Sequence, residues 1–85
     1  MSFMNFSRNL QRLRLIKKEK AADVAADLGI SEATYNSWES GEKEPELNEL
    51  CLLADYFMIT VDNILDAAFD YTNYLRLVRA KGLLG

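Results

Sequence analysis

Apolar residues recur every three or four positions along most of this chain, which is the spacing that buries one side of an α-helix. Capping residues and glycines divide this pattern into separate segments. The pattern predicts an all-α fold, with helices over residues 5–18, 21–28, 32–40, 46–57 and 61–67 and a further helical stripe within residues 68–85.

The inward positions of these helices form a candidate core. Residues at these positions are expected to be buried: Phe6, Leu10, Leu13, Val24, Ala25, Leu28, Tyr35, Trp38, Leu47, Leu50, Leu53, Ala54, Phe57, Ile64 and Leu65. The single cysteine, Cys51, stands among leucines, so it is expected to be a small core side chain rather than a reactive thiol.

The segment between the second and third helices carries a turn signal. Gly29 stands where a left-handed residue ends a helix, and Ser31 is suited to cap the next one, which Gly41 ends. Two short helices joined in this way are typical of a helix-turn-helix, whose second helix can enter a DNA major groove. The sequence therefore predicts that Glu32, Ala33, Asn36 and Ser37 face outward on the third helix.

Charge is distributed unevenly along the chain. The net charge is −3, yet residues 1–20 hold six basic residues and one acidic residue, whereas residues 21–70 hold twelve acidic residues and Lys43 as the only base. Residues 71–85 add three bases. Because contacts with phosphates supply most non-specific affinity for nucleic acids, this balance predicts weak, salt-sensitive DNA binding.

Composition excludes several classes of protein. The chain has no histidine, no metal-ligand spacing, no glycine-rich phosphate loop and no paired carboxylates in a predictable cleft, so we expect neither an enzyme nor a metal or cofactor site. It has no apolar stretch of roughly 20 residues and no signal-peptide layout at its N-terminus. We therefore expect one cytoplasmic domain that does not meet a membrane.

Several motifs together resemble the phage repressor and Cro type of helix-turn-helix domain, also called the xenobiotic response element type. They are Leu13-Arg14, Val24-Ala25, Leu28-Gly29-Ile30-Ser31, Thr34, Trp38-Glu39-Ser40-Gly41, Pro45, Leu53-Ala54 and Thr60-Val61-Asp62. The likeness runs from about Asn9 to Asp66. It implies a lambda-repressor-like, five-helix DNA-binding domain at residues 5–67, encoded by a bacterium or a phage, with an additional C-terminal helix within residues 68–85.

The resemblance also implies roles for individual residues. Glu39 would form a structural ion pair with Arg14, since two partly buried charges persist only when they are paired. Candidates for contact with bases or adjacent phosphates are Ser31, Glu32, Ala33, Thr34, Asn36 and Ser37. Asn36 is the best base-contact candidate, because its amide can bond to N6 and N7 of adenine together. Candidates for phosphate contact are Lys17, Lys18, Lys20 and Lys43.

This sequence departs from the family pattern at three positions. Ala21 stands where many relatives have a glutamine that braces a phosphate and a base, and Glu32 stands where a basic or amide residue is frequent. Met58 occupies the position of the usual glycine after the fourth helix. Either Met58 adopts a positive φ or the turn there is rebuilt. The first two departures predict a lower affinity for DNA.

The C-terminal stripe has two interpretations. Its apolar residues Phe69, Tyr71, Tyr74, Leu75 and Val78 would form a homodimer interface, or they would pack back on the first and fifth helices. A dimer would read two half-sites of operator DNA about one helical turn apart. The alternative function is a protein-interaction module on the same scaffold, such as an antitoxin or an adaptor, whose acidic surface meets a basic protein partner.

Overall fold

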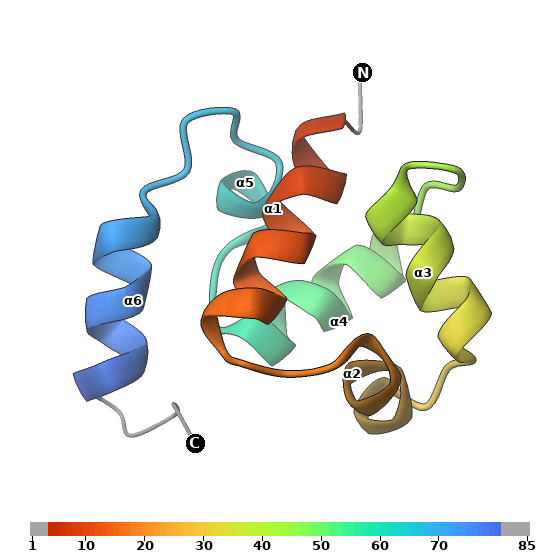
Figure 1. Ribbon diagram of the computed structural model, residues 1–85. Helices are drawn as coiled ribbons and strands as arrows, with labels where there is room; N and C mark the ends of the chain where they lie inside the picture. The colour runs from red at the N-terminus through yellow and green to blue at the C-terminus, as the bar shows by residue number, and fades with distance from the viewer. Residues whose placement is uncertain (1–3, 81–85) are drawn as a thin grey trace.

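A computed structural model describes residues 4–80 of the chain, and within that range it contains helices and no strand (Figure 1). The helices are α1 (Met4–Ile16), α2 (Ala21–Leu28), α3 (Glu32–Ser40), α4 (Leu47–Phe57), α5 (Val61–Ile64) and α6 (Tyr71–Ala80). The predicted all-α class is confirmed. The bounds of α2 and α3 agree with the sequence prediction, whereas α5 ends three residues earlier than predicted.

Helix α1 lies at the centre of the bundle and packs against α3 and α5, while α2 packs against α3 and α4 against α5 (Figure 1). The predicted core is largely confirmed: Leu10, Leu13, Val24, Tyr35 and Leu53 are fully buried. Leu28 and Leu65 are partly buried against this core. One hydrophobic core therefore holds the helices, as expected for a chain of this size.

Two predictions for α4 are wrong, because Leu47 is 73% exposed and Cys51 is exposed as well. Helix α4 begins at Leu47, and Glu46 and Glu49 form a capping box at its N-terminus. Leu50, Leu53, Ala54 and Phe57 fill its buried side. Leu47 precedes Leu50 by three residues, so it lies beside this buried side and is exposed as the first residue of the helix, whereas Cys51 lies on the side opposite Leu53. The local spacing of apolar residues was compatible with either side.

The C-terminal segment packs on its own chain. Tyr74 and Val78 are 4% and 1% exposed, so the interpretation of these two as accessible dimer contacts is wrong in this structure. Phe69 is partly buried against the same core, and Tyr71 and Leu75 are half-buried. Residues 81–85 of the predicted extension lie outside the described residues.

A buried asparagine on α1, which the sequence pattern did not indicate, holds this segment in place. The Nδ2 of Asn9 donates to the carbonyl oxygens of Ile64 (2.9 Å) and Asp66 (2.8 Å), and its Oδ1 accepts from the hydroxyl of Tyr71. Asn9 is 1% exposed. Its amide therefore satisfies the backbone where α5 ends and connects that point to the start of α6.

Met58 has φ 60° and ψ 43°, so the first of the two alternatives for this turn is the one observed. A left-handed conformation costs an L-residue roughly 1–2 kcal/mol, and glycine avoids most of that cost. We therefore expect Met58→Gly to raise the free energy of unfolding by about 1 kcal/mol in urea titrations. Met58→Ala is the control, because it removes the side chain and keeps the strain. A glycine variant less stable than the alanine variant would contradict this explanation.

Candidate nucleic-acid interface

The turn between α2 and α3 is built by local hydrogen bonds. Gly29 has φ 73°, and the cap backbone N–H groups bond to the carbonyls of Ala25 and Ala26, which ends α2. Ser31 then starts α3 by accepting a hydrogen bond from the backbone N–H of Thr34 (3.1 Å). Helix α3 consequently leaves the turn at the edge of the molecule (Figure 1).

One side of α3 is buried and the other is open. Tyr35 and Trp38 are 0% and 3% exposed, in an edge-to-face contact with their ring centroids 6.3 Å apart. Glu32, Ala33 and Asn36 are exposed, as predicted. The amide of Asn36 makes no hydrogen bond to any residue between 4 and 80, so it presents two donors and an acceptor to solvent.

The outward orientation predicted for Ser37 is wrong. Its side chain is 6% exposed, and its Oγ donates to the carbonyl of Thr34 at 2.6 Å. A serine in a helix can bond back to the preceding turn in this way, and here the bond turns the hydroxyl from the surface. Ser37 therefore belongs to the structure of α3, and the accessible surface of the helix is smaller than the sequence indicated.

The predicted structural ion pair is present. The Nε of Arg14 lies 2.6 Å from Oε2 of Glu39, and its Nη2 lies 3.0 Å from Oε1, so the guanidinium binds the carboxylate through two bonds. Arg14 also donates to the carbonyl of Glu19 at 3.1 Å. The side chains of Arg14 and Glu39 are 15% and 11% exposed. The pair thus fixes α3 against α1.

The pair also affects the groups around it. Its hydrogen bond to Glu39 raises the pKa of Arg14 above the ordinary value for arginine. Burial, and secondarily the nearness of Glu39, raises the pKa of Tyr35. Both groups therefore keep one protonation state across the physiological range, and the orientation of α3 does not depend on pH through them.

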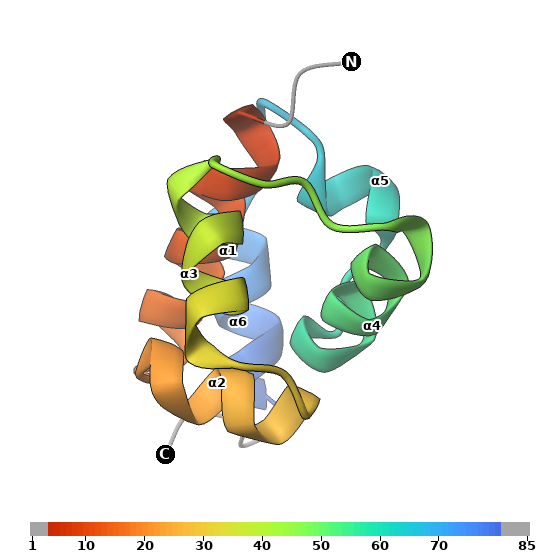
Figure 2. The ribbon, with the colours of Figure 1, turned by 90° about the vertical axis from the view of Figure 1, so that its right-hand side faces the viewer.

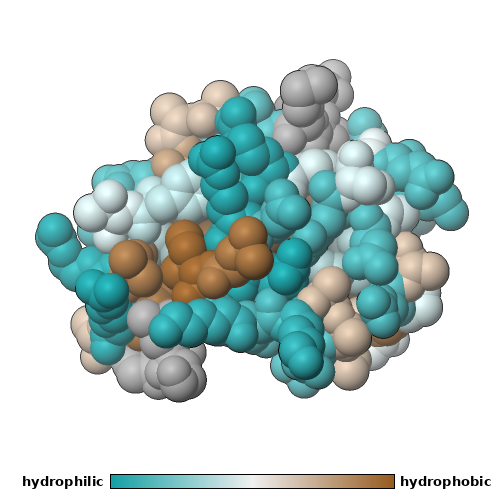
Figure 3. Space-filling view, viewed as in Figure 1, coloured by the Kyte–Doolittle hydropathy of each residue, from teal (hydrophilic) through white to brown (hydrophobic). Residues whose placement is uncertain are grey.

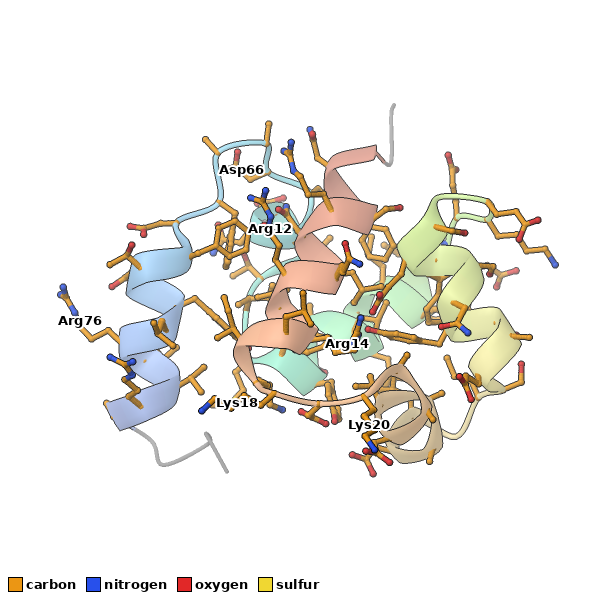
Figure 4. All side chains as sticks on the ribbon, in the orientation of Figure 1. Arg12, Arg14, Lys18, Lys20, Asp66 and Arg76 are labelled. Atoms are coloured by element: carbon orange, nitrogen blue, oxygen red, sulfur yellow. The ribbon has the colours of Figure 1, made fainter. Side chains whose placement is uncertain are left out.

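Three of the four lysines predicted to contact phosphate are exposed, and the fourth is half-buried. Lys18, Lys20 and Lys43 are exposed. Lys17 is half-buried: its Nζ lies 2.9 Å from Oε1 of Glu19 and 4.3 Å from the centroid of the Tyr56 ring. Because its charge is already paired with Glu19, Lys17 would have to leave this partner to bind a phosphate, and its assignment to phosphate stays a prediction. Figure 4 shows Lys20 beside α2, below α3.

A second polar cluster, which spacing alone did not reveal, holds α2 in place. The hydroxyl of Tyr56, near the end of α4, lies 2.5 Å from Oε2 of Glu19 and 2.9 Å from Oδ2 of Asp27. Burial, followed by these two carboxylates, raises the pKa of Tyr56. No signal for this cluster was present in the sequence, because Glu19 and Asp27 are far from Tyr56 in the chain.

Comparison with known proteins finds relatives of this chain, including the three that follow. It is 43% identical over 60 residues to the HTH-type transcriptional regulator AnsR of Bacillus subtilis (strain 168), covering 67% of this chain and 52% of that protein. It is 36% identical over 66 residues to the uncharacterised HTH-type transcriptional regulator YqaE of the same strain, covering 78% of this chain and 50% of that protein. It is 32% identical over 62 residues to the HTH-type transcriptional activator BcrR of Enterococcus faecalis, covering 73% of this chain and 30% of that protein.

The chain spans about half the length of the first two relatives. No solved structure gave a significant match. Within residues 4–80, no helix is long and apolar enough to cross a membrane, and no group of three or more cysteine or acidic side chains is arranged to hold a metal. The helix-turn-helix family model matches residues 10–64, which include α2, α3 and the turn between them, and the chain therefore belongs to the helix-turn-helix family.

Proposed function

We propose that the protein is a sequence-specific DNA-binding regulator of transcription that inserts α3 in the major groove of its operator. The observation that carries this proposal is the outer side of α3, where Glu32, Ala33 and Asn36 are exposed on a helix that an ion pair fixes to α1. A groove-binding helix needs an accessible polar side and a rigid support. The relatives, which are named as transcriptional regulators, support the same conclusion.

The exposed side chains suit different contacts. Asn36 would bond to N6 and N7 of an adenine, and Glu32 would accept from N4 of a cytosine. The hydroxyl of Ser31 donates to Oγ1 of Thr34 at 2.8 Å, so Thr34 keeps its own proton for a base or phosphate oxygen. Ala33 offers only its methyl group, which suits the methyl of a thymine.

Phosphate contacts would be few. Helices α2 to α5 contain no lysine or arginine, so the cations nearest to α3 in the sequence are Lys20 before the motif and Lys43 after it. Ala21 brings no amide to the start of α2. Affinity would therefore depend on base contacts and on the pairing of two copies more than on the backbone of the DNA.

Lys43→Ala is expected to weaken binding to all duplexes alike and to reduce the dependence of log affinity on log salt concentration by about one. The measurement is fluorescence anisotropy with a labelled duplex at several salt concentrations. Lys17→Met is the matched control, because the Nζ of Lys17 is paired with Glu19, and it should leave the salt dependence unchanged. If Lys43→Ala discriminates between sequences, its assignment to phosphate is wrong.

A second candidate function is a protein-interaction module on the same scaffold, as in an antitoxin or adaptor. The four helices α2, α3, α4 and α5 contain no basic residue, which favours this function, because an acidic surface would attract a basic protein and repel phosphate. Absence of binding to any duplex at low salt would favour this function over the first. In either case we propose that the chain acts in pairs, as a homodimer.

A further inference from the structure

A cleft lies between α6 and the part of the fold that the end of α4 and α5 form. It has a volume of about 710 Å³, and its lining includes Asp55 and Met58 near the end of α4, Asn63 on α5, and Tyr74 and Leu77 on α6. A cleft of this volume is in the range that holds a small molecule. None of the candidate DNA contacts lines it.

The cleft is far from the candidate nucleic-acid interface. Figures 1 and 2 agree that α6 and α3 lie at opposite ends of the molecule, with α1 between them. Hydrophobic side chains gather where α6 meets α1 (Figure 3), whereas the cleft lies where α6 faces α5 and the end of α4. A molecule in the cleft would therefore contact α4, α5 and α6 and leave the outer side of α3 open.

The inner wall of the cleft is apolar and partly aromatic. Ala54 and Tyr74 are 3% and 4% exposed, and the ring centroids of Phe69 and Tyr74 lie 5.9 Å apart. Met58 and Leu77 also line the cleft, and both remain exposed. An apolar group that covered these side chains would remove their surface from water, which is favourable in free energy.

The wall also contains a polar group without a partner. The hydroxyl of Tyr74 is buried and forms no hydrogen bond to any residue between 4 and 80. Burial, and secondarily the nearness of Glu19, raises the pKa of Tyr74 to about 12, so this hydroxyl keeps its proton across the physiological range. Most buried hydroxyls have a partner, and the packing of α6 against the core therefore leaves this one unsatisfied at the cleft.

The charged part of the lining is acidic. Asp55, Asp66 and Asp70 are exposed, and no lysine or arginine of the described residues lines the cleft. The two ion pairs found within residues 4–80 involve none of these three carboxylates. Arg8 reaches the connection between α5 and α6, but it donates to the carbonyl of Ala67 at 3.2 Å. The cleft therefore favours a ligand that carries positive charge.

The backbone holds two of these carboxylates in place. The Oδ1 of Asp66 accepts from the N–H of Ala68 at 2.9 Å, and the Oδ1 of Asp70 accepts from the N–H of Asn73 at 3.0 Å. Figure 4 shows Asp66 on the connection that leads to α6. Each Oδ2 makes no hydrogen bond to a described residue. Both carboxylates thus keep a free acceptor, and a group that is already ordered loses little entropy when it binds.

We propose that this cleft binds a small organic cation, in which an ammonium group is joined to an apolar body. The carboxylates attract the ammonium group, and the apolar body covers the aromatic wall. An anion is repelled, and a neutral molecule of the same shape gains only the contact with the wall. The bound cation connects α6 to α4 and α5, so it also stabilises the fold. This inference concerns the protein alone and does not rest on DNA binding.

Phenethylammonium is a suitable probe, with phenethyl alcohol as the neutral analogue and hydrocinnamate as the anionic one. Titration of the unmodified chain is followed through its backbone amide signals in NMR. The cation should move the signals of cleft residues such as Asn63, Phe69 and Asn73 and leave that of Asn36 on α3 in place. We expect a dissociation constant on the order of 1 mM, which is ordinary for so small a ligand. The alcohol should bind at least about fivefold more weakly, and the anion should not bind.

The double variant Asp66→Asn, Asp70→Asn tests the part played by the charges. An amide oxygen can accept the same two backbone bonds, so folding should persist, and circular dichroism checks it. The variant should raise the dissociation constant of phenethylammonium about fivefold, as expected when two exposed charges are removed. Asp23→Asn, Asp62→Asn is the matched control, because it removes two exposed carboxylates that do not line the cleft, and it should leave binding unchanged.

Three results would overturn the proposal. The first is an unmodified chain whose cleft signals do not move at any concentration of phenethylammonium. The second is phenethyl alcohol that binds as tightly as the cation. The third is a dissociation constant that the variant of Asp66 and Asp70 changes no more than the control does. These outcomes concern α6 and its neighbours, so they leave the question of whether α3 reads DNA to the experiments on α3.

Discussion

Glu39→Met is expected to lower the free energy of unfolding by about 3 kcal/mol, because it leaves the partly buried guanidinium of Arg14 without its carboxylate. The two bonds of 2.6 and 3.0 Å are lost, and only the contact between Arg14 and the carbonyl of Glu19 remains. Urea unfolding followed by circular dichroism gives the change in stability. Trp38 lies next to Glu39 in α3, so its fluorescence reports on the same region.

The double variant Arg14→Met, Glu39→Met separates the two parts of this effect. Replacing both charges by apolar side chains of similar length removes the unpaired charge, so the double variant should be more stable than Glu39→Met. If the single and double variants lose the same stability, the attraction between the charges is not what holds α3 to α1, and packing alone explains the position of the helix.

Asn36→Ala is expected to relax the preference for one base pair of the operator and to weaken binding to the preferred sequence by about 1–3 kcal/mol. The reason is that the exposed amide on α3 is the group best suited to pair with two atoms of one adenine. Competition binding with duplexes that differ at single positions measures both quantities. Asn73→Ala removes an exposed amide from α6, away from α3, and should change neither. Equal losses for all duplexes would show that Asn36 meets the phosphate backbone instead.

The parts of the fold that local chemistry controls could be predicted from the sequence. Gly29 and Gly41 adopt left-handed conformations with φ of 73° and 81°, and Ser31 caps α3, so the bounds of α2 and α3 agree with the prediction. The pair formed by Arg14 and Glu39 is also confirmed, although it rested on resemblance to a family. Spacing alone would not have selected these two among the charged residues.

Most of the parts that failed depend on contacts that spacing does not show. An outward position for Ser37 and an inward position for Leu47 fitted the spacing of their helices, but the hydroxyl of Ser37 bonds to the carbonyl of Thr34, and Leu47 is exposed as the first residue of α4. The bonds of Asn9 to Ile64 and Asp66 join residues far apart in the chain, so nothing near Asn9 in the sequence indicates them. Nothing near Lys17 in the sequence distinguishes it from a surface lysine, and only the fold shows that the ring of Tyr56 lies beside it.

These corrections change the proposed interface. Without Ser37 and Lys17, the candidates that remain accessible are Ser31, Glu32, Ala33, Thr34 and Asn36 for bases and Lys18, Lys20 and Lys43 for phosphates. Fewer phosphate contacts mean a smaller electrostatic share of the affinity. The salt-sensitive binding expected from the charge balance is therefore replaced by the expectation of a shallower dependence on salt than is usual for DNA-binding proteins. Pairing of copies would then supply affinity that a single α3 lacks.

Selection of duplexes from a random pool tests most directly whether α3 reads DNA. The proposed function predicts enrichment of a short sequence, affinity for it that falls only gradually with salt, and loss of one conserved base position when the selection is repeated with Asn36→Ala. Enrichment of no sequence, together with no binding to any duplex at low salt, would contradict the proposed function itself.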